Sequence, residues 1–190
     1  MVEIREETQG KTRDLPISDT LKALLTSAAD ECGIDVVRVT SGGQCAKGVC
    51  DKRTGSTRHD NGMAADLQVQ ADGKWLDFTK PDERPIIAAF VRACARLGAT
   101  GIGAAVDYMG PKTLHIGYGP KAYWGKSGKS ANAPDWLGDA VKAGWRDAAP
   151  PAIRTHSKGP DYAPMSDESP DISYDSPYEE EETDWQSPAA

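Results

Sequence analysis

The chain is organised around residues 56–66, which read Ser56-Thr57-Arg58-His59-Asp60-Asn61-Gly62-Met63-Ala64-Ala65-Asp66. A histidine and a carboxylate stand seven residues apart in this stretch, with glycine and small residues between them. Gly62 lets the chain turn sharply after His59, and residues 63–69 are predicted to form a strand that carries Asp66. The pattern Ser-x-x-His-x-x-Gly-x-Ala-x-Asp therefore delivers a loop histidine and a strand carboxylate to one place.

A second histidine follows in Thr113-Leu114-His115-Ile116-Gly117-Tyr118, where residues 114–118 are also predicted to form a strand. Two histidines and one carboxylate are the ligand set of an open, catalytic zinc site, in which the fourth tetrahedral position is left for water. We therefore expect Zn²⁺ to be held by His59, Asp66 and His115. The third histidine of the chain, His156, lies in the C-terminal segment.

Other interpretations of these residues stay open at this stage. Each histidine, taken alone, is compatible with an ordinary loop or packing role. A structural zinc knuckle made of Cys45, Cys50, His59 and His115 is a rival, although a Cys-x4-Cys spacing is at the edge of what such sites use. Without an export signal the four cysteines are expected to be free thiols, and a local Cys45–Cys50 disulfide remains an alternative.

Charge is distributed unevenly along the 190 residues, whose formal net charge is −7. Residues 151–190 carry a net −8, so residues 1–150 are close to neutral at +1. A neutral body offers no clustered basic face for nucleic acid. The sequence contains no run of 18 apolar residues, so no membrane span is expected. Its charged N-terminus lacks the apolar core of a signal peptide.

Hydrophobic periodicity predicts an N-terminal arm (1–17), one domain (18–149) and an acidic, Pro-rich disordered tail (150–190). Ser18 is a typical helix N-cap and Gly33 a typical stop, which bound the first of two helices expected to pack on a sheet. The second helix follows Pro81, and a short third helix follows Pro134. Strands are expected at 35–40, 63–69, 74–78, 101–106 and 114–118. The predicted fold class is α+β, with a small, mainly antiparallel sheet.

The motif from His59 to Asp66, with the later strand histidine His115, resembles the D-Ala-D-Ala carboxypeptidase-like zinc peptidases. That group shares a fold with lysostaphin-type enzymes and includes phage endolysins and D,D- or L,D-endopeptidases. The resemblance implies a hedgehog/D-Ala-D-Ala carboxypeptidase-like fold over roughly residues 18–124, and zinc ligation by these three residues. The family also has a Ser-Gly-Tyr/Phe-Arg segment, and here Ser41-Gly42-Gly43-Gln44 places a glutamine at the basic position. Arg58 or Arg53 is then the candidate to stabilise an oxyanion.

The general base is the point at which the chain departs from the family pattern. Relatives place an acid or histidine two or three residues before the last ligand, or an Asp two residues after it. The corresponding residues here are Lys112, Thr113 and Gly117. Asp107, in the preceding loop, is therefore the candidate base, and Asp60 is the second choice.

The expected function is that of a zinc-dependent peptidoglycan peptidase, cleaving a peptide bond in the stem or cross-bridge. The lack of a signal peptide suits a phage product that sits in the virion, or in the host cytoplasm before delivery to the cell wall. Phage virion proteins are expected partners of the acidic tail. Four aromatic residues after the site either pack in the core or line a substrate cleft: Tyr108, Tyr118, Tyr123 and Trp124. The alternative function is a non-catalytic virion or wall-binding component that keeps the peptidase fold.

Overall fold

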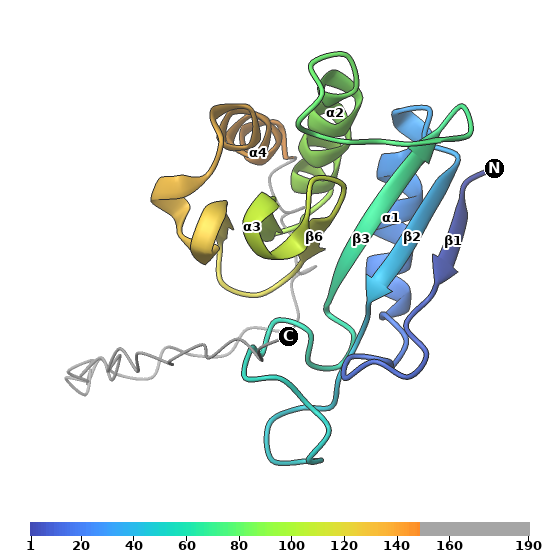
Figure 1. Ribbon diagram of the computed structural model, residues 1–190, viewed down its shortest axis with the longest axis vertical. Helices are drawn as coiled ribbons and strands as arrows, with labels where there is room; N and C mark the ends of the chain where they lie inside the picture. The colour runs from blue at the N-terminus through green and yellow to red at the C-terminus, as the bar shows by residue number, and fades with distance from the viewer. Residues whose placement is uncertain (149–190) are drawn as a thin grey trace, which may run out of the picture. The chain divides into compact units, whose positions relative to one another are not determined.

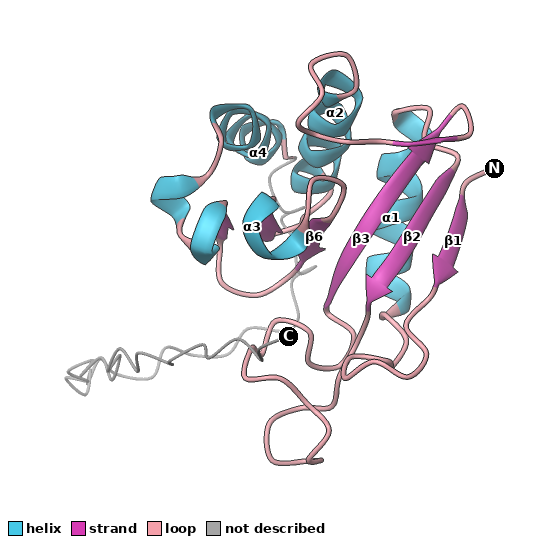
Figure 2. Cartoon of the chain, in the orientation of Figure 1, coloured by secondary structure: helices cyan, strands magenta, loops and turns pink. Residues whose placement is uncertain are grey.

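Seven strands form one mixed sheet in the computed structural model, which describes residues 1–148 (Figures 1 and 2). The strand order is β1-β2-β3-β6-β5-β7, and β4 pairs with β3 beside this path. Their bounds are β1 Glu3–Glu6, β2 Val36–Ser41, β3 Ala64–Ala71, β4 Lys74–Trp75, β5 Gly101–Gly103, β6 Leu114–Gly117 and β7 Ala122–Trp124. Pairings β1–β2 and β5–β7 are parallel and the other four are antiparallel. The predicted α+β class with a mainly antiparallel sheet is confirmed.

The helices are α1 Asp19–Glu31, α2 Arg84–Arg96, α3 Val106–Met109 and α4 Asp135–Asp147. Helix α1 begins where the sequence predicts, because the Ser18 hydroxyl accepts a hydrogen bond from the backbone N–H of Leu21 at 3.2 Å. It ends before Gly33, whose φ of 66° suits glycine. Two 3-10 turns, Lys126–Gly128 and Ser130–Asn132, precede α4.

The hydrophobic core lies on one face of the sheet. Along β3, the side chains of Leu67 and Val69 are buried in this core together with residues of α1, α2 and α4. Figure 1 shows α1 behind β2 and β3. The alternate β3 residues Asp66 and Gln68 are only partly buried and therefore point to the opposite face. Polar groups for chemistry thus gather on the face away from the core.

Four local expectations differ from the structure. The strand expected over 74–78 is only Lys74–Trp75. Part of the arm 1–17 is an edge strand, because β1 pairs parallel with β2 and Glu3 N–H donates to Asp35 O at 2.9 Å. The strand expected over 101–106 stops at Gly103, and Val106 instead begins α3. The segment before α4 contributes β7, which is parallel to β5. Residues 3–6 and 122–124 become strands because their backbones form hydrogen bonds with segments that are distant in the sequence. Residue periodicity does not reveal such partners.

The predicted tail, residues 150–190, lies outside the described residues. Within residues 1–148 the structure contains no helix with the length and hydropathy needed to cross a membrane.

Candidate metal centre

Two neighbouring strands place Asp66 and His115 side by side. Strands β3 and β6 are antiparallel, and their register sets Asp66 directly opposite His115. Directly opposed residues project from the same face of a sheet. The flanking pair Ala65 and Ile116 is fully buried in the core. Asp66 and His115 therefore share the face opposite the core.

His59 reaches the same place from the loop that precedes β3. The turn after it has Asn61 at φ 56° and Gly62 at φ 72°. A Cβ on Gly62 would lie 2.6 Å from the Pro16 carbonyl oxygen and 2.7 Å from Ser18 N, so only glycine fits here. The His59 ring is buried, and its Nδ1 lies 2.8 Å from the carbonyl oxygen of Gly42. Because a carbonyl only accepts, Nδ1 carries the proton and Nε2 is left with its lone pair.

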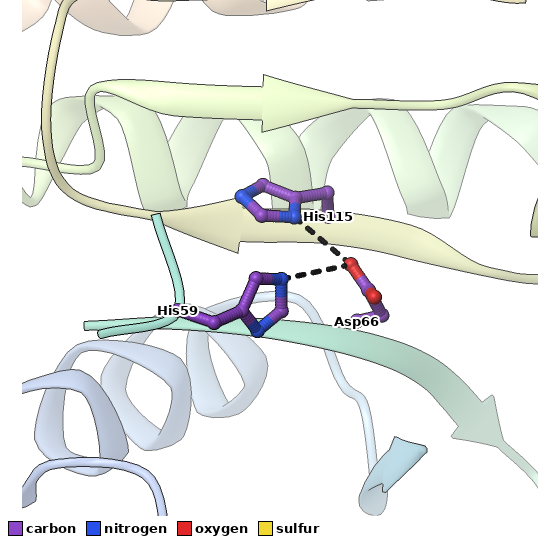
Figure 3. Close-up of side chains that lie close together, drawn as sticks. All are labelled: His59, Asp66 and His115. Atoms are coloured by element: carbon purple, nitrogen blue, oxygen red, sulfur yellow. Dashed lines mark hydrogen bonds and ion pairs between the residues drawn. The ribbon is translucent and has the colours of Figure 1, made fainter. Parts of the chain in front are cut away.

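The three side chains converge on one point (Figure 3). His115 Nδ1 lies 2.9 Å, and His59 Nε2 lies 3.5 Å, from the same oxygen, Oδ1 of Asp66. One ligand atom from each residue can be chosen so that all three lie within 4.8 Å of one another. Ligands bound at 2.0–2.1 Å to a tetrahedral zinc would be about 3.3 Å apart. The separations of 2.9 and 3.5 Å to Asp66 Oδ1, and the upper limit of 4.8 Å, bracket that spacing.

Unpaired buried nitrogen atoms support a metal at this point. His59 Nε2 is buried and has no hydrogen-bond partner, because its lone pair faces Asp66 Oδ1 at 3.5 Å and neither atom carries a proton. Leaving a buried polar atom unpaired costs about 1–3 kcal/mol. A cation between His59 Nε2 and Asp66 Oδ1 would satisfy it. Two imidazoles and one carboxylate suit zinc and related transition metals better than Mg²⁺ or Ca²⁺, which prefer all-oxygen ligands. The residues present therefore fit a metal of this type.

The protonation states of Asp66 and His115 favour binding of a cation. Burial by itself raises the pKa of Asp66, but its hydrogen bond with His115 and its closeness to His59 outweigh burial and hold the pKa well below its usual range. Burial lowers the pKa of His115, although Asp66 acts in the opposite direction. Asp66 is thus an anion and His115 a neutral imidazole at neutral pH, whose Nδ1–H donates to Asp66 Oδ1 and whose Nε2 is buried without a partner. Metal ligands must be deprotonated in this way.

Arg13 is a residue of this site that sequence reasoning missed. Its guanidinium Nη1 lies 3.2 Å from Asp66 Oδ2, the carboxylate oxygen that does not face the histidines. Arg13 lies in the segment interpreted as an arm, 53 residues before Asp66. No periodicity or motif marks it, so sequence alone carried no signal for this contact.

Arg58 contacts Trp124, and Trp124 in turn contacts His115. The Trp124 ring centroid is 4.9 Å from that of His115, and the Arg58 guanidinium carbon is 4.8 Å from the Trp124 centroid. Arg58 also donates to the carbonyl oxygen of Pro120 at 3.0 Å. Its assignment to an oxyanion stays a prediction. Of the four aromatic residues considered above, Trp124 contacts His115, and its indole N–H donates to the hydroxyl of Tyr108 at 2.9 Å.

Both candidate bases are held by other partners. Asp107 is exposed, and its Oδ2 accepts a hydrogen bond from Ser127 N–H at 2.9 Å. It lines an open groove of about 770 Å³ that none of the three ligand candidates lines. Asp60 accepts hydrogen bonds from Gln44 Nε2 at 2.7 Å and Arg53 Nη2 at 2.8 Å. Burial pushes the pKa of Asp60 upward, yet these two donors lower it, so Asp60 is a weak base. The identity of the base stays a prediction.

The loop before His59 is closed by a disulfide between Cys45 and Cys50, with Cα atoms 6.2 Å apart. Cys32 and Cys94 are free thiols. The disulfide decides between the alternatives left open by the sequence, because paired sulfurs are not thiolate ligands for a zinc knuckle. Gln44 is buried and holds the loop together, since its amide donates to Ser56 O at 2.6 Å.

No protein-family model, no curated protein and no solved structure matches this chain. The assignment of the site therefore depends on its own geometry: a possible metal-binding triad of His59, Asp66 and His115 in an α+β domain.

Proposed function

We propose that this protein is a zinc-dependent hydrolase whose metal is held by His59, Asp66 and His115. The observation that carries the proposal is the convergence of two imidazole nitrogens on one oxygen of Asp66, at 3.5 and 2.9 Å. Three protein ligands leave one tetrahedral position for water or substrate, which is the arrangement of catalytic zinc rather than structural zinc. When bound, zinc would polarise a substrate carbonyl and make water a stronger nucleophile at neutral pH.

The chain's own groups then have separate tasks. Asp66 supplies the negative charge that offsets part of the cation's charge, and the His59 Nδ1–H donor to Gly42 O keeps Nε2 available as a ligand. Arg58 is the candidate to stabilise negative charge on a carbonyl oxygen, since it lies beside the Trp124 ring that contacts His115. Asp107 remains the candidate base.

We propose peptidoglycan as the substrate, with cleavage of a peptide bond in its stem or cross-bridge. The support is the resemblance of Ser-x-x-His-x-x-Gly-x-Ala-x-Asp and the later His115 to D-Ala-D-Ala carboxypeptidase-like peptidases. The same resemblance supports the hedgehog/D-Ala-D-Ala carboxypeptidase-like fold, and a phage origin in which the enzyme is delivered to the cell wall. Virion proteins are the proposed partners of the acidic segment 151–190.

The test combines metal and activity. Purified protein is applied to a gel containing purified cell wall, with and without a chelator, and with zinc added back. We expect clearing that the chelator abolishes and zinc restores. Soluble fragments with newly exposed amino groups would identify peptide-bond cleavage. Clearing that persists after complete removal of metal would contradict the proposed mechanism.

A second function is favoured by the partners of the candidate bases. Among residues 1–148, no acidic side chain other than Asp66 forms a hydrogen bond or ion pair with His59 or His115. General-base help is typically worth ~10²–10⁴ in rate, so its loss would leave a metal site with little turnover. The protein would then be a virion or wall-binding component. Stoichiometric zinc and cell-wall binding without clearing would support that alternative.

A further inference from the structure

We propose that Arg13 is a positioning residue of the metal centre. Its guanidinium holds one oxygen of Asp66, so that the other oxygen alone faces His59 and His115. The inference rests on the proposed metal site and adds to it how the carboxylate is oriented.

The guanidinium of Arg13 is fixed on two sides. Nη1 lies 3.2 Å from Asp66 Oδ2, while Nε and Nη2 donate to the hydroxyl oxygen of Thr54 at 3.0 and 2.8 Å. Thr54 in turn donates its N–H and hydroxyl to Gln44 Oε1 at 2.9 and 3.1 Å. Gln44 is 1% exposed. A planar fork with this many partners has little freedom to rotate.

The backbone of this segment is also anchored. Gly42 N–H donates to Arg13 O at 2.9 Å, and Gly43 N–H donates to Leu15 O at 2.7 Å. These bonds attach the segment to the start of the loop that carries His59. Gly42 therefore contacts both sides of the site: its N–H binds Arg13 O, and its carbonyl oxygen binds His59.

The consequence concerns the side-chain torsion of Asp66. The χ2 torsion of an aspartate is broad, so nothing intrinsic to Asp66 selects which oxygen faces the histidines. With Oδ2 bound to Arg13, Oδ1 is the oxygen that lies 2.9 Å from His115 Nδ1 and 3.5 Å from His59 Nε2. Asp66 would then bind a metal through a single oxygen, which suits three protein ligands and one open position.

The positive charge of Arg13 would also oppose binding of a divalent metal ion. Removing that charge would strengthen binding if charge were the larger effect. Arg13→Lys separates the two effects, because lysine keeps the charge but cannot hold Asp66 and Thr54 with a planar fork. Thr54→Val provides a second, milder change, since it leaves Arg13 in place and removes only the hydroxyl that orients it.

The experiment measures zinc affinity of the metal-free protein by competition with a chromophoric chelator, and the visible absorption of the cobalt(II) form. We expect Arg13→Lys to weaken zinc binding ~10–100-fold, the usual effect of losing an outer partner of a ligand, and to change the cobalt spectrum. Thr54→Val should weaken zinc binding by a smaller factor, and its effect should not add to that of Arg13→Lys.

Arg96→Lys is the matched control. Arg96 is likewise an arginine paired with a carboxylate, with 34% of its side chain exposed against 19% for Arg13, but its partner is Glu31, the last residue of α1. It should keep wild-type zinc affinity. Wild-type affinity in both Arg13→Lys and Thr54→Val would overturn the inference, as would an equal loss in Arg96→Lys. If Arg13→Lys does not fold, Thr54→Val decides. Absence of zinc binding in the wild-type protein would instead refute the proposed function.

Discussion

Asp66 and His115 are paired directly across the antiparallel strands β3 and β6, with His115 Nδ1 2.9 Å from Asp66 Oδ1. Backbone register fixes this relationship, so the two groups do not depend on a flexible loop for their approach. A one-residue slip between the strands would move one of them to the core face. The loop residue His59 is the third member, and it is held through its contact with Gly42 O.

Replacing His59 by alanine should abolish stoichiometric zinc binding, because it removes a ligand from the site. The loss of affinity should exceed the ~10–100-fold typical of losing an outer partner. Competition titration on the purified variant measures it. His156→Ala removes the remaining histidine, which lies outside the described residues, and should leave zinc affinity unchanged. Equal loss in both variants would contradict the assignment.

Replacing Gly62 by alanine should destabilise the protein by about 1–3 kcal/mol, since the backbone at this residue is left-handed and a Cβ would press on Pro16 O and Ser18 N. Urea denaturation of the metal-free protein measures the change. Gly55→Ala is the control, because a Cβ at Gly55 meets no atom within 4 Å. If Gly62→Ala has the same free energy of unfolding as the wild type, the turn after His59 tolerates other conformations.

Opening the Cys45–Cys50 disulfide should lower stability by about 2 kcal/mol, the loop-closure estimate for a link with a sequence separation of 5. The double variant Cys45→Ser with Cys50→Ser, compared by thermal unfolding without reductant, measures this. Cys32→Ser is the control, as Cys32 is a free thiol. If the double variant unfolds at the wild-type temperature, the disulfide contributes nothing to the loop that carries His59.

Replacing Glu83 by glutamine should reduce the loss of stability in acid. The Lys74 ammonium lies 2.6 Å from the Glu83 carboxylate and, together with a hydrogen bond from Asp77 N–H, lowers the pKa of Glu83 to about 2 from its ordinary 4.5. Because the pKa is lower in the folded state, the stabilisation is present above pH 4.5 and is lost as the pH falls towards 2.

Urea midpoints between pH 7 and pH 2 test this expectation. The wild-type midpoint should fall more steeply below pH 4.5 than that of Glu83→Gln. Asp82→Asn, which removes the exposed neighbouring carboxylate, should follow the wild-type curve. Parallel curves for wild type and Glu83→Gln would show that the Lys74–Glu83 pair does not contribute to stability.

Sequence alone predicted the parts of the fold that depend on local signals. Ser18 marks the start of α1, and the strand predicted over 63–69 is observed as β3. The convergence of His59, Asp66 and His115 was expected from their spacing and from the resemblance to zinc peptidases, and the structure brings the three together.

The parts that sequence did not predict depend on contacts between distant residues. Arg13 reaches Asp66 across 53 positions, and β1 and β7 are strands because of the parallel neighbours they find. Gln44 occupies the position at which the resemblance predicted a basic residue, yet it is buried and braces the loop through Ser56 and Asp60. Such roles follow from three-dimensional packing, which no local pattern encodes.

The most direct test of the central claim is the metal content of the protein, measured by elemental analysis and by zinc titration. The account predicts one zinc ion per wild-type chain and no stoichiometric zinc in Asp66→Ala or His115→Ala, with the metal-free variants still folded. A wild-type protein that binds no zinc, or a His115→Ala variant that retains one zinc per chain, would contradict it.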